Sequence, residues 1–494
     1  MRSVILFIEL LRSRPSAVFW TAALAQTASW WLVPALFYGA PPDGLAMVLA
    51  VGHQFQLGSE FGPPLAFWLA EIVYSVAGLA GVYLAAQVCV LVALWAMFAL
   101  GRAIVGDRHA ALAVLLMTGI FAFTMPSAEF GPGIAALPLW ALALLHYWRA
   151  AGQGRQLYWL ALGIDLGLLI LTTYAGLVLL ALLLAFTLAT SSGRAQLIAI
   201  EPWLGGVAVV GLLFPHLIWL DQTGGVALAS LGAIEQNLNA WLVLVALLFA
   251  GHAGPAILAA IGHGVPAARE AAPELKREPV DPEARHFILI FAVAPLIGSI
   301  ALALFVGGAH SYVTAPLALL SALAVMVAAP DRIRIAHQRL IAWAFAALLM
   351  LPPLGVAGAI ALLPWLYPIE LKLAQPAAAI GQFFGESFQS RTGQPLMFVG
   401  GDARLASLIA LAAPGRPNLY LDATPELTPW VTPQQIATKG LLVIWPAGDT
   451  RLPPAAIRER FPGLAVESPQ AFARPGRLPP LRIGWGVVGP ALRQ

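Results

Sequence analysis

The stretch GLAGVYLAAQVCVLVALWAMFALG at residues 78–101 decides the fold class, because it carries no charged side chain and is long enough to cross a membrane. A helix needs about 20 apolar residues to span the hydrocarbon core of a bilayer. The whole chain has the same character, with 60% hydrophobic and 10% charged residues among its 494 and a mean hydropathy of +0.82. The sequence therefore predicts a helical membrane protein with many spans.

Ten further apolar stretches of comparable length lie before and after this one. Together they predict eleven transmembrane helices, with residues 157–191 open to a different division. The predicted spans are 16–36, 78–101, 110–126, 131–148, 157–173, 175–191, 203–220, 240–262, 287–308, 311–329 and 340–362.

Basic residues before residue 366 fall only in the segments on one side of these spans, and the loops on the other side carry acids alone. Because loops rich in Lys and Arg stay in the cytoplasm, the N-terminus is predicted to be cytoplasmic. An odd number of spans then places the basic C-terminal region in the periplasm, where long domains are exempt from the charge rule. Fifteen of the 27 basic residues set this orientation: Arg2, Arg12, Arg14, Arg102, Arg108, Arg149, Arg155, Arg194, Arg269, Lys276, Arg277, Arg285, Arg332, Arg334 and Arg339.

The cysteine and arginine content narrows the possible kinds of site and the possible source of the protein. The single cysteine, Cys89, lies in a predicted span, which excludes an internal disulfide and a thiolate metal cluster. No pattern of basic and aromatic residues indicates a nucleic-acid partner. Arginine outnumbers lysine 24 to 3 and alanine is abundant, an association with GC-rich bacterial genomes that favours a bacterial inner membrane.

Residues 41–78 form the longest outer loop before residue 366. Apolar residues recur at helical spacing in 45–52 and again in 65–72, which predicts short amphipathic helices in the membrane interface. The proline pair at 63–64 breaks the chain between them. On the cytoplasmic side, residues 265–285 are charged and Pro-rich and are predicted to be a flexible linker.

The composition changes near residue 366, which predicts two domains: a transmembrane domain at 1–365 and a periplasmic domain at 366–494. Short apolar runs at 396–400, 418–421 and 441–445 alternate with helix-like segments, so the second domain is predicted to be a small α/β unit. The Gly pair at residues 400–401 lacks the spacing of a nucleotide-binding loop and indicates a turn. A lid or a module for docking a partner is the favoured role.

Three acids, Asp43, Glu60 and Glu129, are predicted to lie together on the outer face without a basic residue nearby in sequence. A bound cation, protonation of one acid or a protonatable substrate would relieve their repulsion. Asp43 in PPDG also suits a turn or a helix start, so a structural role is the alternative.

Several other ionisable residues have two interpretations. His53 and His310 lie on the same face and could donate hydrogen bonds to a phosphate, although a single histidine near the interface is more often structural. Asp165 and His216 lie inside spans, where ionisable residues are costly and frequently functional. A helix–helix contact explains Asp165 equally well.

The first outer loop carries a family resemblance. Asp43, Gly52-His53, Gly58, Glu60 and Pro63-Pro64-Leu65 resemble the first periplasmic loop of GT-C glycosyltransferases of the family 39, protein mannosyltransferase-like group. That group includes bacterial enzymes that move a sugar from a polyprenyl phosphate onto lipid A. Further agreement lies in PSAEF at 126–130, GLLILTTYAG at 167–176 and GGAHSYVTAP at 307–316.

The resemblance implies a lipid-phosphate sugar donor, an acceptor hydroxyl on a lipid or glycan, and inversion at the anomeric carbon. A hydroxyl nucleophile needs a carboxylate base, and the resemblance assigns that role to Asp43. It implies no certain cofactor, and a divalent metal near the three acids stays open. The implied substrate contacts are Glu60 and Glu129 for the acceptor or sugar, His53 and His310 for the phosphate, and Tyr174 and Tyr312.

Three departures from the family pattern concern charge. Gly44 stands where a second acid usually follows the first, Gly62 where a histidine precedes the proline pair, and 172–174 lacks the usual basic residue. The leaving phosphate needs positive charge, so Arg391 or Arg404 of the C-terminal domain, or a metal, must supply it. Otherwise the chain binds a lipid-linked sugar without catalysis. A transporter is a third alternative, although no internal repeat supports it.

Overall fold

The computed structural model describes residues 9–225, 238–263, 274–302, 314–335, 337–420, 428, 430–447 and 453–489. His310 and Tyr312 lie outside these described residues. The chain forms two compact units. The first comprises Met1–Leu32, Tyr83–Trp219 and Leu228–Gly355, and the second comprises Val33–Val82, Leu220–Ala227 and Val356–Gln494.

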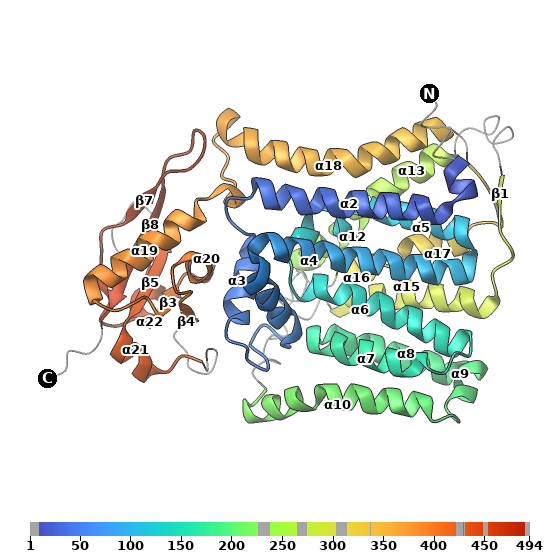
Figure 1. The fold of residues 1–494 in the computed structure, drawn as a ribbon, viewed down its shortest axis with the longest axis horizontal. Helices are drawn as coiled ribbons and strands as arrows, with labels where there is room; N and C mark the ends of the chain where they lie inside the picture. The colour runs from blue at the N-terminus through green and yellow to red at the C-terminus, as the bar shows by residue number, and fades with distance from the viewer. Residues whose placement is uncertain are drawn as a thin grey trace. The chain divides into compact units, whose positions relative to one another are not determined.

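The first unit is a bundle of apolar helices, in which α6 packs against α7 and α5 against α17 (Figure 1). Four long helices, α2 (Pro15–Phe37), α4 (Leu65–Val105), α10 (Glu201–Gln222) and α18 (Gln338–Leu366), begin in one unit and end in the other. The remaining elements are α5 (Asp107–Thr118), η1 (Phe121–Phe123), η2 (Met125–Ala128), α6 (Pro132–Tyr147), η3 (Trp148–Gly152), α7 (Tyr158–Thr172), α8 (Ala175–Ala189), α9 (Ser191–Gln196), α12 (Leu238–Gly251), α13 (Ala253–His263), β1 (Glu274–Lys276), α15 (Pro282–Leu302), α16 (Thr314–Ala318), α17 (Ser321–Ala328) and β2 (Arg332–Arg334).

The predicted fold class, a polytopic helical membrane protein, is confirmed. Among the described residues, six helices are long and apolar enough to cross a bilayer, and a seventh span results if the bent pair α5 and η1–η2 counts as one. The shorter apolar helices α7 and α8 coincide with the predicted stretches 157–173 and 175–191. The number eleven stays a prediction.

The predicted helices of the first outer loop are present in the second unit. Residues 43–52 form α3 (Asp43–Gly52), and α4 starts at Leu65, directly after the proline pair. Gly78 interrupts α4 with φ 60° and ψ −161°, a left-handed conformation that favours glycine. The predicted span at residues 78–101 therefore begins at the residue where α4 is interrupted.

The C-terminal part of the second unit is a six-stranded mixed sheet with the order β4-β3-β5-β8-β6 and β7 paired to β8. Strands β3, β4 and β5 are parallel, and β8 runs antiparallel to β5, β6 and β7. This confirms the predicted α/β region. Its elements are η5 (Lys372–Ala374), α19 (Ala377–Thr392), β3 (Phe398–Gly401), α20 (Ala403–Ala412), β4 (Asn418–Tyr420), α21 (Pro433–Lys439), β5 (Leu441–Pro446), α22 (Ala455–Arg460), β6 (Ala465–Val466), β7 (Gln470–Phe472) and β8 (Leu481–Val488).

Side chains alternate between two cores because successive residues of a strand point to opposite faces. Leu442 and Ile444 of β5 join the core under α19 and α20, whereas Val443 and Trp445 join a second core with residues near α22. Helix α3 adds Ala50 to the first of these cores, which explains why residues 33–82 belong to the second unit. The predicted domain boundary at 365/366 stays a prediction.

Candidate functional site

Asp43 is the first residue of α3, where its negative charge favours the helix N-terminus. Its carboxylate accepts a hydrogen bond of 2.8 Å from Lys372 Nζ through Oδ2. Arg404 Nη1 lies 3.9 Å from Oδ1 of the same carboxylate. The Asp43 side chain remains 40% exposed, so this carboxylate has two cationic partners and is still open to solvent.

The backbone that carries Lys372 and the backbone that carries Arg404 both lie in ordered elements. Lys372 begins the short helix η5, and the next residue, Leu373, accepts backbone hydrogen bonds from Gly39 and Ala40 in the segment that leads to α3. Arg404 lies in the first turn of α20, which Asp402 caps by accepting a hydrogen bond from the backbone of Leu405. Both cations therefore lie on ordered elements.

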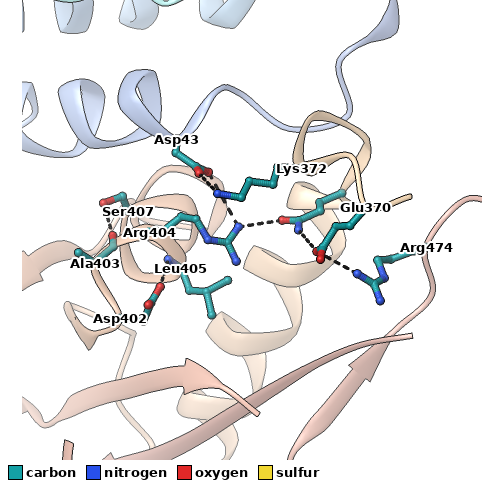
Figure 2. A network of polar contacts seen from close by, with 10 residues as sticks. Asp43, Glu370, Lys372, Asp402, Ala403, Arg404, Leu405, Ser407 and Arg474 are labelled. Atoms are coloured by element: carbon teal, nitrogen blue, oxygen red, sulfur yellow. Dashed lines mark hydrogen bonds and ion pairs between the residues drawn. The ribbon is translucent and has the colours of Figure 1, made fainter. Parts of the chain in front are cut away.

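A chain of polar contacts extends from this cluster (Figure 2). Arg404 Nη1 donates to Gln375 Oε1 at 3.3 Å, and Gln375 Nε2 donates to Glu370 Oε1 at 3.2 Å. Arg474 Nη1 lies 2.9 Å from the same oxygen of Glu370. The network orients Arg404, because the nitrogen that faces Asp43 is also held by the neutral amide of Gln375.

A second cluster lies at the other end of α3. His53 Nδ1 is 3.0 Å from Glu71 Oε1, and Arg416 Nη1 is 2.6 Å from the same oxygen. Arg416 Nη2 also donates to the backbone carbonyl of Leu49 at 3.2 Å. The predicted phosphate contact His53 is thus hydrogen-bonded to a buried carboxylate, and its role toward phosphate stays a prediction.

Glu60 lies in a tight loop closed by two backbone hydrogen bonds between Ser59 and Gly62, each of 3.0 Å. Gly62 has φ 124°, which only glycine adopts readily, so the glycine before the proline pair has a backbone reason. The Glu60 side chain is half-buried. Its role as a substrate contact stays a prediction.

The remaining predicted contacts belong to the first unit or to its undescribed part. Glu129 is exposed directly after η2, and the predicted meeting of the three acids is therefore untested, since Asp43 and Glu60 belong to the second unit. The Tyr174 hydroxyl lies 2.9 Å from His216 Nε2. His310 lies outside the described residues, as does Tyr312.

Of the two arginines named as cation sources, Arg404 lies beside Asp43 whereas Arg391 does not. Arg391 forms two hydrogen bonds to Glu467, of 2.5 and 3.0 Å, and its guanidinium lies 4.5 Å from the centre of the Trp485 ring. The hydrogen bond to Glu467 raises the pKa of Arg391. Arg391 is thereby committed to a contact within the α/β region.

Sequence reasoning missed Lys372, Glu71 and Arg416. Their partners lie far away in sequence: 329 positions separate Lys372 from Asp43, and 345 separate Arg416 from Glu71. The only local signal was Glu71, an acid within the apolar face pattern of residues 65–72. No three His, Cys, Asp or Glu side chains among the described residues form a group that could hold a metal. A metal near Asp43, Glu60 and Glu129 stays a prediction.

Comparison with known proteins identifies related folds. The family model for dolichyl-phosphate-mannose-protein mannosyltransferases matches residues 62–219. The crystal structure of ArnT from Cupriavidus metallidurans bound to undecaprenyl phosphate has a TM-score of 0.60 at 14% identity, over 96% of this chain and 97% of that one. Its apo state has a TM-score of 0.61 with the same identity and coverage.

The apo oligosaccharyltransferase of Archaeoglobus fulgidus shares the fold less closely, with a TM-score of 0.51 at 15% identity, over 88% of this chain and 69% of that one. The curated proteins contain no match. The family match and the shared fold confirm the predicted resemblance to the GT-C glycosyltransferases. The described apolar helices and the shared fold support a multi-pass membrane protein with the fold of these transferases.

Proposed function

We propose that this protein transfers a sugar from a polyprenyl-phosphate donor to a hydroxyl of a lipid or glycan at the periplasmic face of the bacterial inner membrane. Asp43 acts as the general base. The observation that carries the proposal is the carboxylate of Asp43 beside Lys372 and Arg404, in a chain with the fold of an ArnT that binds undecaprenyl phosphate. Such a reaction needs a base for the acceptor and positive charge for the leaving phosphate.

In the proposed mechanism, the Asp43 carboxylate takes the proton of the acceptor hydroxyl as its oxygen attacks the anomeric carbon. The bond between that carbon and the phosphate oxygen breaks, polyprenyl phosphate leaves, and the configuration at the anomeric carbon inverts. Lys372 is the group best suited to the phosphate, because its ammonium lies on a flexible stem and is 58% exposed. When phosphate binds, Lys372 moves its contact from Asp43 to the phosphate, which frees the carboxylate for the proton.

Arg404 is the less mobile cation in this scheme. It is 25% exposed and held by Gln375, so it stabilises negative charge without leaving its place. Glu60 and Glu129 remain proposed contacts to the sugar or acceptor, and His53 and His310 remain proposed contacts to the phosphate. Tyr174 and Tyr312 remain proposed substrate contacts.

The decisive experiment compares Asp43→Asn with wild-type protein in nanodiscs. Transfer of labelled sugar from a panel of polyprenyl-phosphate sugars to membrane lipid extracts is expected to fall at least about 100-fold, as loss of a general base predicts. Binding of undecaprenyl phosphate should be retained. Asp402→Asn is the matched control, because asparagine also caps a helix, and it should transfer at the wild-type rate.

A second candidate function is binding of a lipid-linked sugar without catalysis. The ion pair between Asp43 and Lys372 favours it, since the ammonium already occupies the carboxylate when no substrate is present. Wild-type protein that binds undecaprenyl phosphate but transfers none of the tested sugars would support this function. Undiminished transfer by Asp43→Asn would remove Asp43 as the base.

A further inference from the structure

Arg416, in the loop between α20 and β4, joins the C-terminal α/β region to both helices of the first outer loop. Its guanidinium donates to Glu71 Oε1 at 2.6 Å and to the carbonyl oxygen of Leu49 at 3.2 Å. The same group lies 4.6 Å from the centre of the Tyr74 ring. Leu49 belongs to α3, and Glu71 and Tyr74 belong to α4. One side chain therefore fixes the crossing of two helices.

The backbone at this position is strained. Arg416 has φ 47°, in the left-handed region, directly after Gly415 with φ 79°. A residue with a side chain rarely adopts this conformation unless surrounding contacts hold it there, and such strain concentrates at functional positions. The contacts of the guanidinium with Glu71 and Leu49 are what hold it here.

The ion pair between Arg416 and Glu71 positions the groups it joins more than it stabilises the fold. The Glu71 side chain is 5% exposed and that of Arg416 is 19% exposed. Within the part of the chain that the structure describes, buried Glu71 Oε2 and Arg416 Nε make no hydrogen bond. A buried ion pair with unsatisfied atoms contributes little net stability, whereas it does specify which groups meet.

Helix α3 carries this constraint to Asp43. Asp43 is its first residue, and Leu49 and His53, which the cluster holds, lie at its other end. Over its 10 residues α3 is only about 15 Å long, so it moves as a rigid rod. A shift of its C-terminal end would move the Asp43 carboxylate relative to Lys372 and Arg404.

We propose that Arg416, through its ion pair with Glu71, is a positioning residue that sets the orientation of α3 and thereby of Asp43. The inference rests on the proposed function for its catalytic consequence, but its structural part is independent of activity. Arg416 itself touches no reacting group in this scheme.

The structural part is tested by hydrogen–deuterium exchange of the full-length protein in nanodiscs without substrate. Arg416→Gly removes the side chain, and glycine adopts the left-handed backbone without strain. Amides of residues 45–53 should exchange about tenfold faster in this variant. Arg391→Ala is the matched control, since it removes another arginine–glutamate pair of the same unit, in which Arg391 binds Glu467, and it should leave these amides unchanged.

The catalytic part is tested by initial rates with the sugar donor that the wild-type protein uses. In Arg416→Gly, kcat should fall about tenfold to 100-fold, as expected for a misplaced catalytic group, with the donor KM within about twofold of wild type. Arg416→Lys should restore part of the rate, because an ammonium still pairs with Glu71. In the Asp43→Asn background, Arg416→Gly should cause no further loss, whereas a smaller folded fraction would lower both backgrounds by the same factor.

Glu71→Gln is the second variant in case Arg416→Gly does not fold, and it should give the same faster exchange and lower kcat. Unchanged exchange at 45–53 in a folded variant would overturn the inference, as would equal losses in the two Asp43 backgrounds. If the wild-type protein transfers no sugar, the proposed function fails, and the exchange result alone decides whether Arg416 holds α3.

Discussion

Lys372 donates a hydrogen bond of 2.8 Å from Nζ to the carboxylate of Asp43, although 329 positions separate the two residues in the chain. The loops before residue 366 that are predicted to lie on the outer side contain acids and no basic residue, so the cation that the proposed transfer needs must come from another segment. The segment that follows α18 supplies it. In the proposed function, this pair provides a base and a cation for transfer from a phosphate donor.

Lys372→Ala is expected to raise the KM for a polyprenyl-phosphate sugar about tenfold to 100-fold. A hydrogen bond to a charged group contributes about 1.5–3 kcal/mol, and the ammonium is proposed to contact the donor phosphate. Initial rates against donor concentration in nanodiscs measure the effect. Lys372→Arg should recover part of the affinity because the charge remains.

Lys439→Ala serves as the control for this prediction, because Lys439 lies at the end of α21 in the same unit and is exposed. It should not change the KM. An unchanged KM in Lys372→Ala, with kcat also unchanged, would show that the donor phosphate is held by other residues.

Removal of divalent metal is expected to leave the rate within about twofold of the untreated enzyme. Lys372 and Arg404 already supply positive charge beside Asp43, so the phosphate has cationic partners from the chain. The measurement is transfer after incubation with EDTA and removal of the chelate. Loss of activity that returns with added Mg²⁺ or Mn²⁺ would instead establish a metal bridge between acids and phosphate.

The sequence predicted features that local patterns determine. The apolar stretch from residue 78 and the runs at 396–400, 418–421 and 441–445 match a helix break at Gly78 and strands β3, β4 and β5. Periodicity and turn residues carry this information within a few positions. The same local patterns indicated a helix start at Asp43, whereas its role as a base was implied by the family resemblance.

Contacts between distant segments were beyond local patterns. The sequence around Lys372 and Arg416 does not indicate Asp43 or Glu71 as a partner, because these acids lie in residues 41–78 and are brought close by packing of α3 on α20. Arg391 and Arg404 looked equivalent as basic residues of one domain. Only the fold shows that Glu467 binds the first and that Asp43 lies beside the second.

Asp165 is expected to support the packing of α6 and α7 and to have no part in transport. Its Oδ2 lies 2.5 Å from His146 Nδ1, and both side chains are largely buried. Asp165→Ala should lower the melting temperature more than Asp165→Asn, because it leaves His146 buried without its partner at a cost of about 1–3 kcal/mol. Tryptophan fluorescence during thermal unfolding in detergent gives the melting temperatures of the two variants and of the wild-type protein.

The same variants separate a transferase from a transporter. Sugar transfer per folded molecule should be unchanged in Asp165→Asn. Movement of a lipid-linked sugar across proteoliposomes that depends on Asp165 would contradict the structural role and favour a transporter, since intramembrane acids commonly carry that function.

Gly52→Ala is expected to destabilise the protein and to lower sugar transfer. A Cβ at Gly52 would lie 2.4 Å from the backbone oxygen of Phe67, where α3 crosses α4, so the helices would have to separate. Overpacking of this kind costs about 1–3 kcal/mol. Gly211→Ala in α10 is the control: its Cβ meets nothing within 4 Å, and alanine should be neutral or stabilise the helix by about 0.5–1 kcal/mol. Equal melting temperatures and equal transfer rates for the two variants would show that the α3–α4 crossing tolerates a wider spacing than Arg416 and Glu71 are proposed to impose.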